Sequence, residues 1–283
     1  MVNPTLQLGP LTIRWYGLLL VSGAFVGAYV AALEAQRRGE NPDHAWNILT
    51  PALIAGIIGA RLYHVFSTPA GCTATVMGCG WPWYSQHPEY IVQVWRGGLG
   101  IYGGIAGGLL VILGYVWWNG LNLCRWLDFA APALLIGQAI GRWGNFVNQE
   151  LYGPPTTLPW GIPIDTAHRL SQYAQLPPET RFHPLFLYES LWNLIGFGLL
   201  LLISRRGQRW LKEGDLALLY VLWYPLGRLW IEALRPDAWR LAGLPTAQLI
   251  SLALIVIAIG GLMVRHWRST PPQEPGHARP PTH

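Results

Sequence analysis

Charged residues are scarce in this chain of 283 residues: Asp, Glu, Lys and Arg make up 12% of it, and hydrophobic residues make up 52%. Soluble domains carry about 25% charged residues, so the composition excludes an ordinary soluble domain and indicates an integral membrane protein. The formal net charge is only +5, and the basic residues gather at the ends of apolar runs instead of on one basic face. We therefore expect no nucleic-acid partner.

Cysteine and the familiar catalytic motifs are also lacking. The three cysteines, Cys72, Cys79 and Cys124, show neither a CxxC nor a zinc-binding spacing. Cys72 and Cys79 share one loop and could form a disulfide in an oxidising compartment. The chain has no Gly-x-Ser-x-Gly elbow, no His-Glu-x-x-His helix and no P-loop. We expect no metal and no cofactor, and an enzyme of this kind would use a nucleophile supplied by a second substrate.

Apolar segments of roughly 20 residues, long enough to cross a bilayer, recur along the chain. Seven are expected, over residues 13–34, 46–67, 98–118, 126–144, 185–204, 215–235 and 246–265. Basic residues follow the first, third, fifth and seventh, and the positive-inside rule assigns those connections to the cytoplasm. The prediction is an all-α integral membrane protein with about seven transmembrane helices, its N-terminus outside and its C-terminus inside. The first segment is too long for a cleavable signal and has no basic region before it.

The expected domain organisation is simple. Residues 1–269 form one transmembrane domain, and the proline-rich residues 270–283 form a disordered cytoplasmic tail. Two long outer segments, 68–97 and 145–184, contribute a small extracytoplasmic cap. Asp128 opens the fourth span, where an acid satisfies free backbone amides, and we interpret it as a cap of that helix.

Glycines recur at four-residue intervals at the start of the third span, in the sets Gly100/Gly104/Gly108 and Gly103/Gly107. A face of small residues lets two helices approach closely in lipid. We favour this packing role over direct contact with a ligand. Tyr102 is a polar ring at the outer end of the same span.

The densest polar stretch covers residues 141–150, where the fourth span emerges on the outer side. Arg142 offers a planar fork of donors suited to a phosphate or carboxylate. Asn145 and Asn148 offer donors and acceptors, and an ionised Glu150 only accepts. Gly141 and Gly144 allow close backbone approach or positive φ. A polar helix end at a membrane surface is the simpler explanation, and a headgroup site is the alternative that the other spans favour.

Ionisable residues within spans are costly and tend to be functional. In the sixth span Tyr224, Arg228 and Glu232 recur every four residues on one helical face, and Arg235 follows. An intrahelical Arg228–Glu232 pair would explain part of this pattern. Two arginines with one acid nevertheless leave positive charge uncompensated, which favours an anionic ligand.

Three further polar residues lie at the ends of spans. Arg61 ends the second span, either as another anion ligand or with its guanidinium reaching the outer interface. His183 precedes the fifth span. Glu189 lies within it and needs a partner, either an arginine or backbone donors. Taken together, these residues predict a pocket for a phosphate-bearing amphiphile whose acyl chains remain in lipid.

Several sequence patterns occur together in one order. They are Arg14-Trp15-Tyr16-Gly17, Gly59-x-Arg61, the stretch 98–104, Asp128-x-x-Ala131-Pro132, Gly141-Arg142-x-Gly144-Asn145-Phe146-x-Asn148-x-Glu150-x-x-Gly153, His183-Pro184-x-x-x-x-Tyr188-Glu189, and Tyr224-x-x-x-Arg228-x-x-x-Glu232. In these patterns, which cover nearly the whole chain, the sequence resembles the bacterial prolipoprotein diacylglyceryl transferases.

The resemblance implies an activity and a location. The family transfers the diacylglyceryl group of phosphatidylglycerol to the lipobox cysteine thiol of a preprolipoprotein signal peptide. A thioether forms and glycerol 1-phosphate leaves, which is the first step of lipoprotein maturation. The implied location is the bacterial inner membrane, with the active site facing the extracytoplasmic side and the lipid bilayer and both substrates as partners.

The resemblance also implies site residues. Arg142 and Arg228 would hold the lipid phosphate and stabilise the leaving group, with Tyr102 and Glu232 as further catalytic residues. The implied substrate-binding residues, besides Arg142, are Tyr16, Arg61, Gly98, Gly103, Gly104, Asn145, Asn148, Glu150, Tyr224 and Arg235. His183 and Glu189 would support them.

Tyr102 is a departure from part of the family, because some members carry a histidine there that has been proposed as the base for the thiol. A tyrosine with the ordinary pKa of ~10 is a poor base near neutral pH. Clustered arginines could lower the pKa of Tyr102, or they could lower the pKa of the incoming thiol so that little base is needed. We hypothesise that Tyr102 orients the thiol or the phosphate while electrostatics generate the thiolate.

Three other classes of protein compete with this interpretation. An anionic-lipid transporter or flippase also places arginines within a bundle, although inverted repeats with broken helices, its common signature, are not detected. A CDP-alcohol phosphotransferase requires clustered metal-binding aspartates, which the spans lack. A non-catalytic membrane scaffold is the third alternative.

Overall fold

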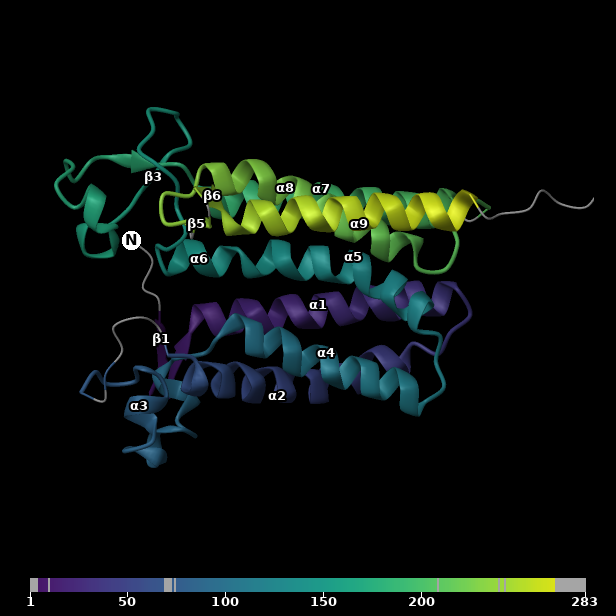
Figure 1. Ribbon diagram of the computed structural model, residues 1–283, viewed down its shortest axis with the longest axis horizontal. Helices are drawn as coiled ribbons and strands as arrows, with labels where there is room; N and C mark the ends of the chain where they lie inside the picture. Colours follow the sequence, from purple (N-terminus) through teal and green to yellow (C-terminus); the bar gives the residue numbers. More distant parts are fainter. Residues whose placement is uncertain are drawn as a thin grey trace, which may run out of the picture.

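The computed structural model describes residues 5–9, 11–68, 73, 75–207, 209–238, 240–241 and 243–267. Its long helices lie side by side along the longest axis of the molecule (Figure 1). They are α1 (Trp15–Arg37), α2 (Asp43–Phe66), α4 (Ile101–Trp118), α5 (Leu123–Gly141), α7 (Leu185–Arg206), α8 (Asp215–Ala233) and α9 (Thr246–Trp267). The predicted all-α membrane fold is confirmed, because these helices dominate the described residues and most are strongly apolar.

The short elements gather mainly at one end of the bundle. They are β1 (Thr5–Leu8), β2 (Leu11–Arg14), α3 (Gly80–Tyr84), η1 (Pro88–Tyr90), η2 (Val94–Arg96), α6 (Trp143–Val147), β3 (Ile162–Pro163), η3 (Thr166–His168), η4 (Ser171–Tyr173), β4 (Arg181–Phe182), β5 (Arg240–Leu241) and β6 (Leu244–Pro245). The strands form three antiparallel pairs, β1–β2, β3–β4 and β5–β6. The loops that follow α1, α4 and α7 lie at the opposite end (Figure 1).

Among the described residues, six helical segments are long and apolar enough to cross a membrane. They are α1, α2, α4, residues Leu123–Val147 (which include α5 and α6), α7 and α9. The remaining predicted span corresponds to α8, which carries Asp215, Arg228 and Glu232 and packs against α5, α7 and α9. The count of seven spans and the orientation in the membrane therefore stay predictions. The predicted tail, residues 270–283, lies outside the described residues.

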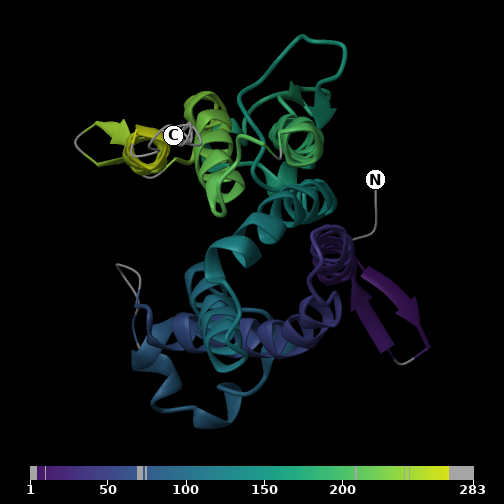
Figure 2. The ribbon, with the colours of Figure 1, turned by 90° about the vertical axis from the view of Figure 1, so that its right-hand side faces the viewer.

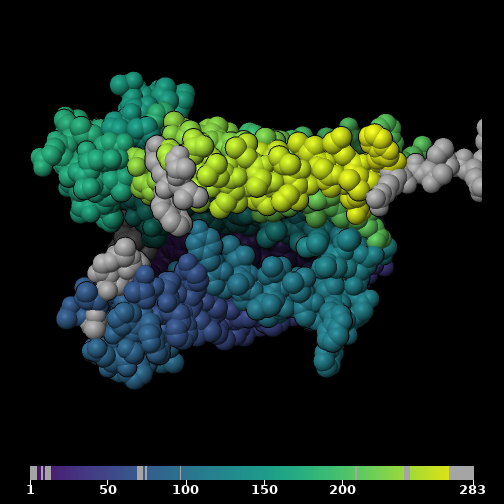
Figure 3. Space-filling model, viewed as in Figure 1, coloured from purple at the N-terminus to yellow at the C-terminus, as the bar shows by residue number. Residues whose placement is uncertain are grey.

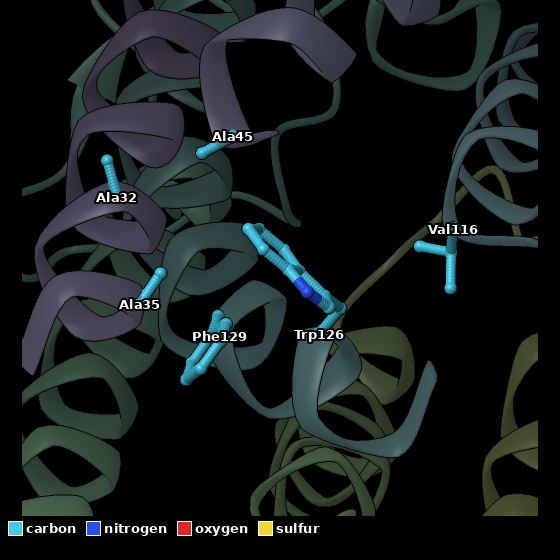
Figure 4. Packing of buried hydrophobic residues seen from close by; sticks show 6 residues of the cluster. All are labelled: Ala32, Ala35, Ala45, Val116, Trp126 and Phe129. Atoms are coloured by element: carbon cyan, nitrogen blue, oxygen red, sulfur yellow. The ribbon is translucent and has the colours of Figure 1, made fainter. Parts of the chain in front are cut away.

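Helix α5 is the central element of the bundle. It packs against α1, α7 and α8, whereas α2 and α4 pack chiefly against each other. The end-on view shows α5 between the α7–α9 group and the α2–α4 group (Figure 2). In the space-filling view the surface is hollowed between α9 and the α2–α4 group (Figure 3). One buried apolar cluster joins α1, α2, α4 and α5 through Ala32, Ala35, Ala45, Val116, Trp126 and Phe129 (Figure 4). A second joins α5 to α7 and α8.

The prediction that Asp128 caps its own helix is wrong. Asn122 caps α5, where its side chain accepts from the Arg125 backbone N–H at 3.2 Å. The Asp128 carboxylate instead accepts from the backbone N–H groups of Gly214 and Ala217, at 2.9 and 3.1 Å. It therefore caps α8, a neighbouring helix. Sequence spacing could not show this, because helix α8 begins more than 80 residues later in the chain.

The predicted packing role of the glycine face is confirmed. A Cβ on Gly103 would collide with the backbone of Gly59 and with Tyr63, and one on Gly107 would collide with the backbone of Ala55. Close approach of α2 and α4 therefore depends on the missing side chains, as expected where lipid gives little hydrophobic drive between helices. Of the cysteines, Cys79 is disulfide-bonded and Cys124 is free; Cys72, the partner expected for Cys79, lies outside the described residues.

The close contact between α2 and α4 predicts that one added methyl group lowers stability at some glycines of α4 and not at others. In Gly103→Ala the added Cβ would push α2 and α4 apart, and overpacking of this kind destabilises by ~1–3 kcal/mol. Gly114→Ala, in the same helix, is the matched control because a Cβ there meets nothing within 4 Å. We expect Gly103→Ala to lower the thermal midpoint in detergent and Gly114→Ala to preserve it. Equal midpoints would contradict the packing role.

Candidate active site

The polar stretch 141–150 lies at the end of the bundle that carries the short elements (Figure 1). Helix α5 ends at Gly141, Arg142 connects it to the short helix α6, and a turn follows from Asn148. Helix α6 packs against α1 and α7. Arg142 is therefore placed where α5 meets the start of α7.

One carboxylate joins two arginines that are far apart in sequence. Arg142 Nη2 lies 2.5 Å from Glu189 Oε2, and Arg228 Nη1 lies 2.8 Å from Glu189 Oε1. The glutamate side chain, on α7, is only 7% exposed, and the arginine side chains are 22% and 14% exposed. Glu189 thus holds a guanidinium from the end of α5 beside one from α8. The predicted arginine partner of Glu189 is confirmed.

The contacts continue in both directions from this pair. Along α8, Arg228 also pairs with Glu232, and Arg235 Nη1 lies 3.7 Å from Glu232 Oε1. Arg235 in turn pairs with the more exposed Asp237 at 3.0 Å. We call the connected set the arginine–carboxylate network; it comprises Asn148, Glu150, Asn145, Arg142, Glu189, Arg228, Glu232, Arg235 and Asp237.

The amides of the 141–150 stretch form the other end of this network. Arg142 Nη1 donates to Asn145 Oδ1 at 3.4 Å. Asn145 and Asn148 both donate to Glu150 Oε1, at 2.9 and 3.3 Å, and the Glu150 backbone N–H donates to the Asn145 carbonyl at 3.0 Å. Asn145 is buried, whereas Glu150 is exposed. The stretch therefore links a partly buried arginine to an exposed carboxylate.

The expected excess of positive charge is wrong. Glu189 supplies a second acid to Arg228, and the three arginines of the network are paired with two glutamates and one aspartate. Placing an unpaired guanidinium within an apolar bundle is costly, and the carboxylates remove that cost. Each guanidinium still carries five N–H donors, so the paired arginines retain donors for an anion. The network favours an anion by directed hydrogen bonds more than by net charge.

The glycines of the stretch have different roles from one another. Gly144 permits close approach, since a Cβ there would lie 2.5 Å from the ring of Tyr16 on α1. Nothing lies within 4 Å of such a Cβ on Gly141. Positive φ occurs instead at two residues with side chains, Gln149 at 53° and Leu151 at 55°. Of the two roles expected for these glycines, close approach is confirmed at Gly144, and neither glycine has positive φ.

Tyr224 lies one turn before Arg228 and lines a small pocket between α7 and α8 with Glu189, Asn193 and Arg228. Its ring stacks on that of Tyr220 at 6.0 Å. Asn193 is 1% exposed, and both polar atoms of its amide are without a hydrogen-bond partner among the described residues. Sequence analysis missed Asn193, although it lies one turn from Glu189 on the same helical face.

His183 holds the outer segment against α7 and makes no contact with the network among the described residues. Its Nδ1 lies 3.0 Å from the hydroxyl of Tyr188, which accepts from the indole N–H of Trp160 at 2.9 Å. Its carbonyl accepts from the backbone N–H of Gly153 at 2.9 Å. Nearby, burial raises the pKa of Tyr152 above its ordinary value, and the neutral hydroxyl receives the Leu170 backbone N–H at 2.6 Å.

Besides His183, Tyr16 and Tyr224, five predicted site residues lie outside the network as the described residues define it. The guanidinium of Arg61 donates to the backbone carbonyls of Tyr90, Ile91, Gly97 and Gly98. Gly98 packs on His64 and Arg61, while Gly103 and Gly104 face α2. Tyr102 is 65% exposed with its ring 5.7 Å from that of Tyr63. In the described part of the chain, no hydrogen bond or ion pair joins Tyr102 to the network.

The fold and the site define a multi-pass membrane protein with paired arginines at one end of its helical bundle. No group of three or more His, Cys, Asp or Glu residues is placed to hold a metal ion in the part of the chain that the structure describes. The family model described as prolipoprotein diacylglyceryl transferase matches residues 4–264. The chain belongs to this family.

Relatives from distant bacteria extend the similarity over nearly the whole chain. A protein of Chloroflexus aggregans named phosphatidylglycerol–prolipoprotein diacylglyceryl transferase is 40% identical over 96% of this chain and 92% of its own. Proteins with the same name from Trichormus variabilis and Streptococcus equi subsp. zooepidemicus are 40% and 38% identical, each over 94% of this chain. The alignments span 90% of the Trichormus variabilis protein and 96% of the Streptococcus equi protein.

The shared carboxylate predicts a large effect of removing one charge. In Glu189→Gln, two partly buried guanidinium ions would lie beside each other without the carboxylate that they share, and breaking a buried pair in this way costs ~3–5 kcal/mol. Asp237→Asn is the matched control, because Asp237 is 33% exposed at the end of the network and exposed pairs contribute only ~0–1 kcal/mol.

Thermal unfolding in detergent checks this prediction. We expect a clear fall in the midpoint for Glu189→Gln and little change for Asp237→Asn. Similar midpoints for the two variants would show that Glu189 does not hold the arginines together.

Proposed function

We propose that this protein transfers the diacylglyceryl group of phosphatidylglycerol to the lipobox cysteine of a preprolipoprotein at the extracytoplasmic face of the bacterial inner membrane. The thiol sulfur attacks the terminal glycerol carbon of the diacylglyceryl group. A carbon–sulfur bond forms, the bond from that carbon to the phosphate oxygen breaks, and glycerol 1-phosphate leaves. The thiol loses its proton to water as the thiolate forms, and the leaving phosphate monoester keeps the electron pair of the broken bond.

One observation carries this proposal: Glu189 holds the guanidiniums of Arg142 and Arg228 side by side, although they belong to different helical elements. Two planar sets of donors on one site suit the oxygens of a phosphodiester. The membership of the family and the names of the relatives agree with such a substrate.

The same pair of arginines can promote the reaction itself. As the carbon–oxygen bond breaks, negative charge grows on the phosphate of the leaving group. Donors that are already in place stabilise this charge without reorganising, and in a site of low dielectric the effect is large. Arg142 and Arg228 therefore bind the phosphate and act as catalytic residues, while Glu189 and Glu232 keep them in position.

The amide end of the network suits the rest of the headgroup. The terminal glycerol of phosphatidylglycerol carries hydroxyl groups that both donate and accept hydrogen bonds. Asn145, Asn148 and the exposed carboxylate of Glu150 offer matching partners next to Arg142. Tyr16, which packs on Gly144, closes this side of the site, and Tyr224 and Arg235 border it on α8.

Tyr102 takes no base role in this proposal. Its exposed position at the start of α4 supports contact with the thiol or phosphate as they enter, and the arginines lower the pKa of the incoming thiol. Full activity of Tyr102→Phe would show that its hydroxyl transfers no essential proton.

The proposed activity is tested with purified protein, phosphatidylglycerol and a lipobox peptide in detergent containing a chelator. We expect the peptide to gain the mass of one diacylglyceryl group, and we expect no gain on a peptide whose cysteine is replaced by alanine. Removing a donor to a developing anion typically costs ~100–1,000-fold in rate, so Arg142→Ala and Arg228→Ala should lose at least that much.

Arg206→Ala is the control for these two variants, because this exposed arginine lies at the opposite end of the bundle. It should retain wild-type activity. Absence of transfer by the wild-type protein, or undiminished transfer by Arg142→Ala, would overturn the proposal.

A further inference from the structure

The turn that carries Glu150 has an unusual backbone. Gln149 and Leu151, which flank Glu150, have φ values of 53° and 55°, and they are the residues other than glycine with positive φ among the described residues. Side chains with a Cβ disfavour this left-handed region, and glutamine is not among the residues enriched there. Such a conformation persists only where the surrounding structure enforces it.

The surrounding structure does so through Asp165. Gln149 Nε2 donates to Asp165 Oδ2 at 2.7 Å, and the Asp165 backbone N–H donates to Gln149 Oε1 at 2.7 Å. The two residues therefore hold each other by a reciprocal pair of hydrogen bonds across 16 positions of the chain. Both are partly buried. We call this pair the Gln149–Asp165 clamp.

Asp165 is in turn fixed by the outer segment. It follows Ile164, which is 3% exposed in a small apolar core with Tyr152 and Phe182. The buried guanidinium of Arg169 donates to the Ile164 carbonyl at 2.9 Å and to further backbone carbonyls of the same segment. The clamp thus connects a rigid support to the turn.

The turn decides where Glu150 points. Its carboxylate accepts hydrogen bonds from the side chains of Asn145 and Asn148, and its backbone N–H donates to the Asn145 carbonyl. If Gln149 returned to an ordinary negative φ, the chain would leave this turn in another direction, and these contacts would be lost. Asn145 contacts Arg142, so the displacement would reach the headgroup side of the site.

We propose that Asp165 and Gln149 are positioning residues: their clamp enforces the left-handed turn that aims Glu150 at Asn145 and Asn148 beside Arg142. Neither residue touches the reacting atoms. The inference rests on the proposed function for its consequence in catalysis, but the conformational claim stands separately. Sequence spacing gives no signal for Asp165, because the clamp joins a turn to a distant loop.

Two substitutions of Gln149 distinguish a clamp that enforces the left-handed turn from a clamp that only ties the outer segment to it. Gln149→Ala and Gln149→Gly both remove the side chain that forms the clamp. Only glycine adopts a φ near 53° without steric penalty. If the clamp serves to enforce the turn, Gln149→Ala should lower kcat/KM for phosphatidylglycerol about tenfold, equivalent to ~1.4 kcal/mol, and Gln149→Gly should retain most of it.

The partner residue provides a second comparison. We expect Asp165→Ala to lower kcat/KM and the double variant Asp165→Ala/Gln149→Gly to recover most of the loss. Thr156→Val is the matched control in the outer segment, where it removes a turn hydrogen bond from the Leu158 backbone N–H at 3.2 Å. It should keep wild-type activity. Equal losses for Gln149→Ala and Gln149→Gly, or no rescue in the double variant, would overturn the proposal.

Hydrogen exchange tests the conformational claim even if the wild-type protein transfers no lipid. The Glu150 backbone amide should exchange faster in Gln149→Ala and in Asp165→Ala than in the wild type, and Gln149→Gly should restore its protection. Unchanged protection in Gln149→Ala and Asp165→Ala would overturn the proposal. Absence of transfer by the wild type, with the expected exchange pattern, would overturn the proposed function alone.

Discussion

A single carboxylate shared by two arginines is the interaction on which the rest of this structure depends. Glu189 pairs with Arg142 and with Arg228, and these three side chains come from three separate parts of the fold. In an apolar bundle, each of them alone would carry a large desolvation cost. Their mutual pairing lets α8, which carries Arg228 and Glu232 within its length, pack against α5 and α7.

The two ends of the bundle use buried acids differently. At the end away from the cap segment, Asp128 accepts backbone N–H groups at the start of α8, and Asp215 pairs with Arg265 and His266 on α9. Those contacts connect helices. At the other end, the acids hold arginines whose side chains stay partly exposed. There, the exposed part of each guanidinium leaves donors that a second set of acceptors, such as phosphate oxygens, can reach.

Close helix packing and the polar site are supported by separate parts of the molecule. The α2–α4 crossing depends on glycines that bring backbones together, and Arg61 joins the following loop to α2 through backbone carbonyls. The arginine–carboxylate network belongs to α5, α6, α7 and α8. Tyr102 lies on the first part and Arg142 on the second, so a substrate that contacts both would lie between the two groups of helices.

Patterns with a helical period were predictable, and contacts across the fold were not. Four-residue spacing placed Arg228 and Glu232 on one face, and the glycine intervals indicated close packing, because both depend only on the geometry of one helix. Glu189 was expected to pair with an arginine or with backbone donors, but its sharing by two arginines depends on how α5, α7 and α8 meet. That sharing is why the expected excess of positive charge was wrong.

Loop contacts were beyond prediction for a related reason. Asp165 has no periodic relation to Gln149, and the positive φ values fall on residues that ordinarily avoid them, so no local preference indicates either feature. Asp128 was assigned to the wrong helix because the predicted span began at residue 126, whereas α5 begins at Leu123 and places Asp128 beyond its first turn. The amides that it caps lie on α8, which only the tertiary structure brings near.

The central claim is that Arg142 and Arg228 act together on one phosphate. The most direct test is a double-mutant cycle on phosphatidylglycerol binding in nanodiscs, with Arg142→Ala, Arg228→Ala and the double variant. If both guanidiniums bind the same phosphate, the second substitution should weaken binding much less after the first, because the shared interaction is already lost. Strictly additive losses in binding free energy would contradict the account.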